Sequence, residues 1–253
     1  RILEAKQPKF FLAENVSGML ISKHTEALEG IKELFRNAGI GYELSFQMLN
    51  ASDYNVPQDR KRVFFIGIRK DLNFKYQFPT ETFPKITLES AISDLKEGVL
   101  PALEFNNTNG ENCAVPNHEY MIGSFSTIFM SRNRVRSWDE QSYTIQAGGR
   151  HAPIHPQAPK MKFIEQNIRV FVPGKEHLYR RLSIRECARI QTFPNDFIFH
   201  YKKVAAGYKM IGNAVPVNLA KFLANSIMQQ IKANEITTKK VKQTQKAKEA
   251  IAI

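Results

Sequence analysis

The sequence predicts an α/β fold that contains half of an open sheet, followed by a smaller loop-rich domain. Residues 10–68 have the pattern of a strand, a helix and two strands, prolines accumulate between about 72 and 180, and helical patterns return from residue 183. With 253 residues, 43% of them hydrophobic and 24% charged, the chain is long enough for one large folded domain or two ordinary ones.

The half sheet is expected to begin with an apolar strand at residues 10–13 that turns polar at Glu14. The active sites of open α/β sheets gather at the carboxyl ends of the strands, so this carboxylate is a candidate, although a Glu-Asn at a strand end is more often a turn or a helix cap. Periodicity then predicts a helix and two further strands, at residues 25–37, 42–49 and 63–68. We expect the opening strands of such a sheet to lie outside these residues.

The later part of the chain carries clear helix signals. Ser183 and Glu186 have the spacing of a capping box, and Pro216 suits the first turn of another helix. We therefore expect residues 1–75 to form half of the sheet domain and residues 76–182 to form the loop-rich domain. Residues 183–232 should form a capped helix and a return to the sheet domain, and residues 233–253 a mobile basic tail.

The net charge of +12 indicates a polyanionic partner, with nucleic acid favoured over an anionic membrane. Residues 232–253 hold six lysines and two glutamates, which account for only +4 of that surplus. No run approaches the roughly 18 apolar residues of a membrane span, so no membrane partner is expected. Two cysteines and six histidines show no metal-ligand spacing, so we expect no metal site and a cytoplasmic, bacterial setting.

Four sequence blocks carry the functional signal, although each alone is modest evidence. They are PKFFLAENV, PQDRKR, RRLSIRECARIQTFP and GNAVP, at residues 8–16, 57–62, 180–194 and 212–216. Their order and spacing resemble the late conserved blocks of DNA cytosine-5 methyltransferases, over residues 1–232. The resemblance is strongest to the HaeIII-type, GGCC-modifying members, through FMSRNRVR at 129–136 and GKEHLYRRL at 174–182.

This resemblance implies the second half of a Rossmann-like sheet of methyltransferases that use S-adenosylmethionine, with a small loop-rich target-recognition domain. In the implied reaction a cysteine thiolate adds to C6 of a flipped cytosine, and C5 then takes a methyl group from S-adenosylmethionine. A group that shares a proton with N3 stabilises the electron density that moves there. By resemblance this group is Glu14, which we expect at a largely apolar strand end, where a shared proton is favoured.

The PQDRKR block supplies the other expected active-site residues. By resemblance, Arg62 holds the cytosine O2, Arg60 supports the neighbouring phosphate and the site, and Gln58 helps to position this loop at the DNA. Side chains at alternate positions of a strand point the same way, so we expect both arginines to face one cleft. The alternative is that they are exposed strand charges.

Residues 97–159 contain several arginines but no lysine. Arginine is favoured for bidentate contact with guanine, whereas a generic phosphate-binding surface would use both residue types. By resemblance the base readers are Arg132, Arg134 and Arg150. Gly148 and Gly149 are expected to give the last of these a flexible approach. The alternative is that the three are surface arginines paired with Asp139 or Glu140.

The GNAVP block resembles the last block of the family. The resemblance implies that Asn213 and the backbone amide of Ala214 face the amino-acid end of S-adenosylmethionine, with Gly212 allowing close backbone approach at a helix entrance. The family's Pro-Cys-Gln and Phe-x-Gly-x-Gly segments are absent, and neither Cys113 nor Cys187 has such a context. We therefore expect the catalytic cysteine and the glycine-rich loop outside this chain, which alone would be inactive.

The sequence is therefore interpreted as the C-terminal part of a DNA cytosine-5 methyltransferase of a restriction-modification system. Its expected partners are duplex DNA with a GGCC target and a missing N-terminal segment or partner subunit. Three alternatives stay open: one subunit of a split enzyme, a DNA-binding module without catalysis, and an RNA methyltransferase. The arginine-rich recognition region disfavours the last.

Overall fold

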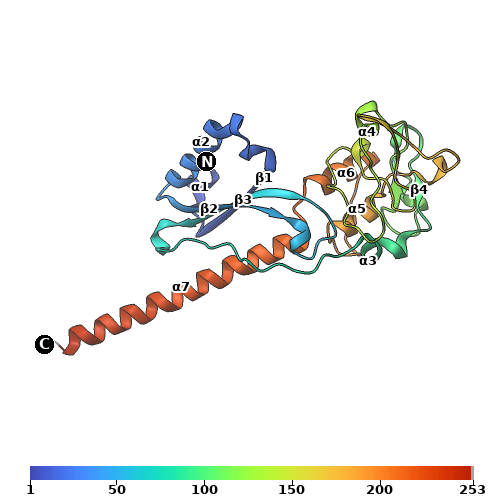
Figure 1. The fold of residues 1–253 in the computed structure, drawn as a ribbon. Helices are drawn as coiled ribbons and strands as arrows, with labels where there is room; N and C mark the ends of the chain where they lie inside the picture. Colours follow the sequence, from blue (N-terminus) through green and yellow to red (C-terminus); the bar gives the residue numbers. More distant parts are fainter. Residues whose placement is uncertain (252–253) are drawn as a thin grey trace. The chain divides into compact units, whose positions relative to one another are not determined.

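A computed structural model describes residues 1–251, apart from the side chains at 242 and 245–251. These residues form two compact units (Figure 1). Unit 1 contains Arg1–Leu49, Lys61–Glu81 and the chain from Ala220 onward, whereas unit 2 contains Asn50–Arg60 and Thr82–Leu219. Each unit is therefore assembled from segments that are far apart in the sequence.

Unit 1 is built on a three-stranded sheet in the order β1-β3-β2. The strands are β1 Phe10–Val16, β2 Tyr42–Asn50 and β3 Lys61–Arg69. β1 runs antiparallel to β3, with Phe10 opposite Ile68 and Val16 opposite Arg62. The predicted strands are present, and β3, which reads as an apolar run, occupies the centre of this sheet.

Helices cover both faces of this sheet. Besides the short α1 (Ile2–Lys6), unit 1 contains α2 (Thr25–Asn37), which has the predicted bounds, and most of α7 (Val217–Ile251). On β3, Val63 and Phe65 pack with Leu28 of α2, whereas Ile66 and Ile68 pack with α7. Successive side chains of a strand point to opposite faces, so one strand contributes to two layers of core.

Helix α7 extends through the segment that was expected to be a basic tail. Ile231 is still in the core, and the next turn is attached to the rest of unit 1 by two polar contacts. Asn234 Nδ2 donates to the Leu72 carbonyl at 2.7 Å, and Lys9 Nζ lies 2.9 Å from the Glu235 carboxylate. The mobility of this tail stays a prediction, and residues 252 and 253 lie outside the described residues.

Unit 2 is loop-rich, as predicted, and its regular elements are short. The helices are α3 Leu88–Ile92, α4 Thr127–Met130, α5 Ile184–Ile190 and α6 Val204–Asn213. The strands are β4 Leu100–Pro101 parallel to β5 Glu119–Tyr120, and β6 Lys162–Glu165 antiparallel to β7 Ile168–Val170. Residues 183–219, which we assigned to the return toward the sheet domain, belong to unit 2.

A buried carboxylate organises the start of α5. Ser183 and Glu186 form the predicted capping box, in which the Ser183 amide donates to the Glu186 carboxylate at 2.7 Å. Arg180 donates to both carboxylate oxygens, at 2.8 and 2.7 Å, and His155 Nε2 lies 3.4 Å from one of them. Burial opposes ionisation of Glu186, but Arg180 and these neighbours hold its pKa below the ordinary value.

Acidification should destabilise unit 2 through His155. Burial lowers the pKa of this imidazole to about 4, below its ordinary 6.5. Between these two pH values the unfolded chain binds a proton that the folded chain excludes. The free energy of unfolding should therefore decrease as the pH is lowered from about 6.5 to about 4, by up to about 3 kcal/mol. The only tryptophan, Trp138, packs edge-on against the His155 ring, so its fluorescence follows denaturant unfolding of unit 2.

The matched variant is His155→Gln. It should show a smaller loss of unfolding free energy between pH 7 and pH 4.5 than the unmodified chain, because the group that titrates is gone. Equal losses in the two proteins would contradict the role given to His155.

Candidate functional site

Glu14 and Arg62, two of the predicted catalytic residues, lie together in unit 1. Glu14 is opposite Phe64 in the β1–β3 register, and Arg62 lies two residues before Phe64 on β3, so both side chains project from one face. Arg62 Nε lies 2.8 Å from Glu14 Oε1, with side-chain exposures of 16% and 21%. The strand end is therefore a partly exposed ion pair, which corrects the expectation of a largely apolar strand end.

The residues that follow Glu14 line an apolar cavity of about 350 Å³. Its walls come from the end of β1, the turns after it and the first half of α2, namely Asn15, Val16, Gly18, Met19, Ile21, Lys23, His24, Ala27, Leu28 and Ile31. Ligand sites commonly combine an apolar hollow with a few polar groups at the carboxyl end of a strand. The end of β1 borders such a hollow, but neither Glu14 nor Arg62 lines it.

Arg60 does not share this arrangement, because it belongs to unit 2. Strand β3 begins at Lys61, so the strand alternation that we expected for Arg60 and Arg62 does not apply. The Arg60 side chain is only 2% exposed, and its guanidinium donates to the carbonyls of Ile145 at 3.1 Å and Gly212 at 2.9 Å. The expectation that Arg60 and Arg62 face one cleft from one strand is therefore corrected, because the observed acceptors of Arg60 are backbone carbonyls. Its support of a phosphate stays a prediction.

Gln58 positions the recognition segment, which we define as residues 142–150. Its Oε1 accepts a hydrogen bond from the Ile145 amide at 2.9 Å, and a β-bridge pairs it with Ser142. Thr144 Oγ1 also donates to the Asp59 carbonyl at 2.6 Å. Since the Gln58 side chain is buried, it acts on this loop through protein contacts.

The cofactor segment, defined as residues 212–216, begins at the end of α6. The Asn213 side chain is exposed, and a carboxamide can both donate and accept hydrogen bonds, as the amino-acid end of S-adenosylmethionine requires. The Ala214 amide, by contrast, donates to the Ile211 carbonyl at 3.1 Å, so it closes the helix end. Of the two predicted cofactor contacts, the Asn213 side chain fits better.

Gly212 lies near the end of α6 and not at a helix entrance, which corrects the expected position. A Cβ at this position would lie 2.4 Å from both the Ala147 nitrogen and the Gln146 carbonyl carbon. Glycine is therefore required here because the backbone of α6 comes close to the backbone of the recognition segment.

Arg134 is held by backbone carbonyls. Its Nε donates to the Phe129 carbonyl at 2.8 Å, its Nη2 donates to the Ile128 carbonyl at 3.1 Å, and its guanidinium lies over the Phe129 ring. These bonds occupy the Nε–Nη2 edge of the guanidinium, and the Nη1–Nη2 end could take a further acceptor. Burial lowers the pKa of Arg134, and the charge of Arg132 lowers it further.

Arg132 and Arg150, the other predicted readers, are both exposed in unit 2. Arg150 follows Gly149, which is buried, and a Cβ on that glycine would lie 2.7 Å from the Tyr208 ring. The chain before Arg150 is therefore fixed by packing at this point, which corrects the flexible approach that we expected.

A polar cavity of about 190 Å³ lies beside Arg134. It is lined by Asp59, Arg134, Tyr143, Thr144, Gln146, His151 and Pro153. His151 carried no assignment from the sequence, although its position next to Arg150 was a signal that could have singled it out. The structure thus adds His151 and Gln146 to the surroundings of a predicted base reader.

The ion pair considered as the alternative for the readers is made by Arg136. Its Nη1 lies 2.8 Å from Glu140 and its Nη2 lies 3.2 Å from Asp59. The Ser137 amide and Arg136 lower the pKa of Glu140 to about 2. Arg136 therefore has a structural function, while Arg134 contacts carbonyls.

The two thiols lack the surroundings of a reactive cysteine. Cys187 is buried in α5, and burial raises its pKa well above the ordinary value. Burial also raises the pKa of Cys113, and the charge of Glu119 raises it further. Because the thiolate is the nucleophile, both sites disfavour the reactive form.

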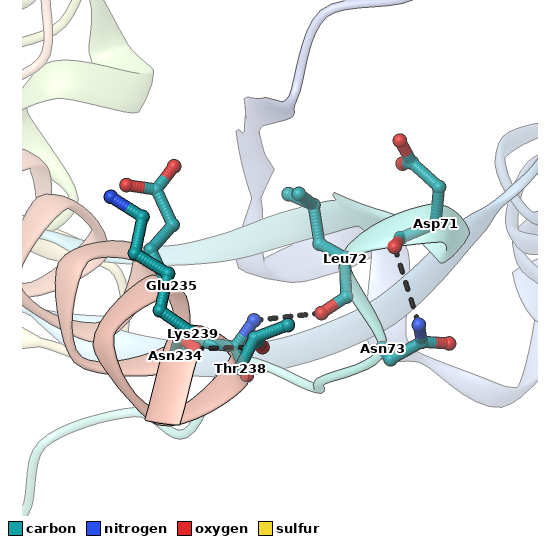
Figure 2. Close-up of a pocket in the computed structure, with 7 residues that line it drawn as sticks. All are labelled: Asp71, Leu72, Asn73, Asn234, Glu235, Thr238 and Lys239. Atoms are coloured by element: carbon teal, nitrogen blue, oxygen red, sulfur yellow. Dashed lines mark hydrogen bonds between the residues drawn. The ribbon is translucent and has the colours of Figure 1, made fainter. Parts of the chain in front are cut away.

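A further cavity, of about 390 Å³, lies in unit 1 between the turn after β3 and α7 (Figure 2). Its wall contains none of the predicted site residues and consists of Asp71, Leu72, Asn73, Asn234, Glu235, Thr238 and Lys239. Within the described part of the chain, no cluster of three or more histidine, cysteine or acidic side chains suits a metal ion. No described helix has the length and apolarity needed to cross a bilayer.

Comparisons with known proteins match most of the chain. The family model for C-5 cytosine-specific DNA methylases matches residues 1–229. The chain is 56% identical over 230 residues to Type II methyltransferase M.MthTI of Methanothermobacter thermautotrophicus, covering 91% of this chain and 69% of that protein. It is 52% identical over 246 residues to M.FnuDI of Fusobacterium nucleatum, covering 96% and 71%.

The fold is also similar to solved structures. A prophage-encoded protein of Escherichia coli, assigned as a DNA modification methyltransferase, aligns with a TM-score of 0.61 at 21% identity. The alignment covers 90% of this chain and 71% of that one. The likeness supports the fold class predicted from the sequence.

Gly212→Ala should destabilise unit 2, because the added methyl group meets backbone atoms that cannot rotate away. We expect a loss of about 1–3 kcal/mol, measured from the Trp138 fluorescence transition in denaturant. Gly30→Ala is the matched control, since a Cβ on this α2 glycine meets nothing within 4 Å and lies in unit 1. An unchanged midpoint for Gly212→Ala would show that the two segments do not approach so closely.

Proposed function

The chain belongs to the C-5 cytosine-specific DNA methylase family, and we propose that it is the C-terminal part of a Type II enzyme that methylates a flipped cytosine in GGCC sites of duplex DNA. Its identity of more than 50% to two Type II methyltransferases supports the reaction class. The HaeIII-like blocks support the GGCC target. The contact between Glu14 and Arg62 is the structural observation that carries the proposed site.

The Glu14–Arg62 pair suits the edge of a cytosine that carries N3 and O2. Addition at C6 moves electron density toward N3, where a carboxyl group that shares a proton stabilises the developing charge. Arg62 Nε contacts Glu14 and its Nη1 donates to the Lys61 carbonyl at 2.8 Å, which leaves Nη2 for the base oxygen. In the proposed complex, Glu14 exchanges part of its contact with Arg62 for the base.

S-adenosylmethionine, when bound, supplies an activated methyl group. Among the residues of this chain, we assign the exposed Asn213 carboxamide to the amino-acid end of this cofactor. Ala214 shapes the same segment through the hydrogen bond that its amide donates to the Ile211 carbonyl. Arg132, Arg134 and Arg150 are proposed to read guanines, and the net charge of +12 favours a DNA partner.

Residues 1–253 alone should not transfer methyl groups to DNA. The reaction needs a thiolate beside C6, and the surroundings of Cys113 and Cys187 raise both thiol pKa values. The assay measures labelled methyl transfer from S-adenosylmethionine to a GGCC duplex, with and without a segment that carries the Pro-Cys-Gln and glycine-loop motifs. Methyl transfer that appears only when the separate segment is added would support the proposal that this chain needs such a segment for activity.

Other outcomes of this assay separate the alternatives. Transfer by the 253 residues alone that is lost in Cys113→Ser or Cys187→Ser would contradict the proposed catalytic centre. Binding of the GGCC duplex without transfer in any combination would favour a DNA-binding module. A preference for transfer RNA over duplex DNA would favour the RNA-methylating alternative.

Arg134→Lys tests base reading. Lysine keeps the charge but loses the planar fork, so discrimination against a substitution of one guanine should fall by about 1–3 kcal/mol. Dissociation constants for GGCC and singly substituted duplexes, measured at one salt concentration, give this difference. A uniform loss of affinity for all duplexes would make Arg134 a phosphate contact instead.

A further inference from the structure

Three segments of unit 2 meet around the Arg60 guanidinium. They are residues 57–60 of the PQDRKR block, the recognition segment and the cofactor segment. Arg60 Nη1 donates to the Ile145 carbonyl at 3.1 Å, and Nη2 donates to the Gly212 carbonyl at 2.9 Å. One side chain thus binds the backbone of both the loop that precedes Arg150 and the last turn of α6, just before Asn213.

Neighbouring contacts join the same segments from other sides. Gln58 accepts from the Ile145 amide, so both backbone polar groups of Ile145, its N–H and its C=O, have side-chain partners from residues 57–60. The Asp59 amide donates to the Ser142 carbonyl at 2.9 Å, and the Ser142 amide donates to the Pro57 carbonyl at 3.0 Å. Gly212 lies so close to residues 146–147 that no side chain fits between them.

Arg60 is unsuited to direct contact with DNA in this arrangement, because its side chain is 2% exposed. A planar guanidinium can bind two carbonyls that diverge from it at fixed angles, whereas the single ammonium of lysine cannot reproduce both bonds. The loss of either bond would leave a buried carbonyl without its partner. The geometry therefore fixes the two functional segments relative to each other.

We infer that Arg60 is a positioning residue that couples the recognition segment to the cofactor segment, and that this coupling sets the placement of Arg150 and Asn213 together. The inference rests on the proposed function for the roles of those two residues. The coupling itself rests only on contacts within unit 2, so it can be tested separately from those roles.

Hydrogen–deuterium exchange of the 253-residue chain tests the coupling directly. In Arg60→Met, peptides that cover residues 142–150 and 209–216 should exchange at least about fivefold faster, as expected for the loss of a hydrogen bond worth about 1 kcal/mol. A peptide that covers α5, residues 184–190, should be unchanged. Arg60→Lys should produce the same pattern and retains the positive charge if the methionine variant fails to fold.

Arg189→Met is the matched control. This arginine belongs to the same unit and pairs with Asp94 at 2.9 Å, a residue outside the three segments. It should leave exchange of residues 142–150 and 209–216 unchanged. Faster exchange in only one of the two segments, or equally throughout unit 2, would overturn the coupling.

Binding to DNA provides a second measurement. Arg60→Lys should lower the ratio of affinities for GGCC and singly substituted duplexes by at least about threefold, although Arg60 is buried, because Arg150 is displaced. Unchanged discrimination together with paired exchange effects would overturn the placement of Arg150 by Arg60. If the unmodified chain shows no preference for GGCC, the proposed target fails, while the exchange data still decide whether the segments are coupled.

Discussion

Unit 2 is loop-rich, so many of its buried backbone carbonyls have no partner in a helix or a sheet and need another hydrogen-bond donor. Buried guanidinium groups are such donors, and the structure of unit 2 depends on them. Arg60, Arg181 and Arg185 are each at most 3% exposed. Their acceptors include the carbonyls of Ile145, Gly212, Met121, Gly123, Ser124, Pro116 and Phe197. Burial lowers the pKa of Arg181 and Arg185, so several hydrogen bonds are needed to keep each charge inside. Arginine thus gives a loop-rich unit a fixed shape.

In unit 1, strands and helices provide most of the partners for backbone N–H and C=O groups. Arg62, at the end of a strand, contacts a side chain instead. Arg62 contacts the Glu14 carboxylate where both side chains still reach solvent. Arg60 and Arg62 are two residues apart in one block, yet one supports the interior of unit 2 and the other belongs to the proposed reaction site of unit 1. The start of β3 at Lys61 separates these functions.

Local signals predicted the elements that depend on local chemistry. The helix at Thr25–Asn37, the apolar strand β3 and the Ser183–Glu186 capping box are all present because spacing and capping act over a few residues. The contacts of Arg60 were missed, since a buried arginine and an exposed one look alike in a sequence. The reason for Gly212 was also missed, because its neighbours lie more than 60 residues away at Gln146 and Ala147.

The buried arginines also change what the net charge means for association with DNA. Four guanidinium groups, those of Arg60, Arg180, Arg181 and Arg185, lie inside unit 2 and are at most 8% exposed. The salt dependence of binding reflects the counterions released from DNA when surface cations replace them at phosphates. Cations in the interior displace no counterions. A plot of log affinity against log salt concentration should therefore be shallower than the count of basic residues suggests, and its slope would count only the cations that reach the surface.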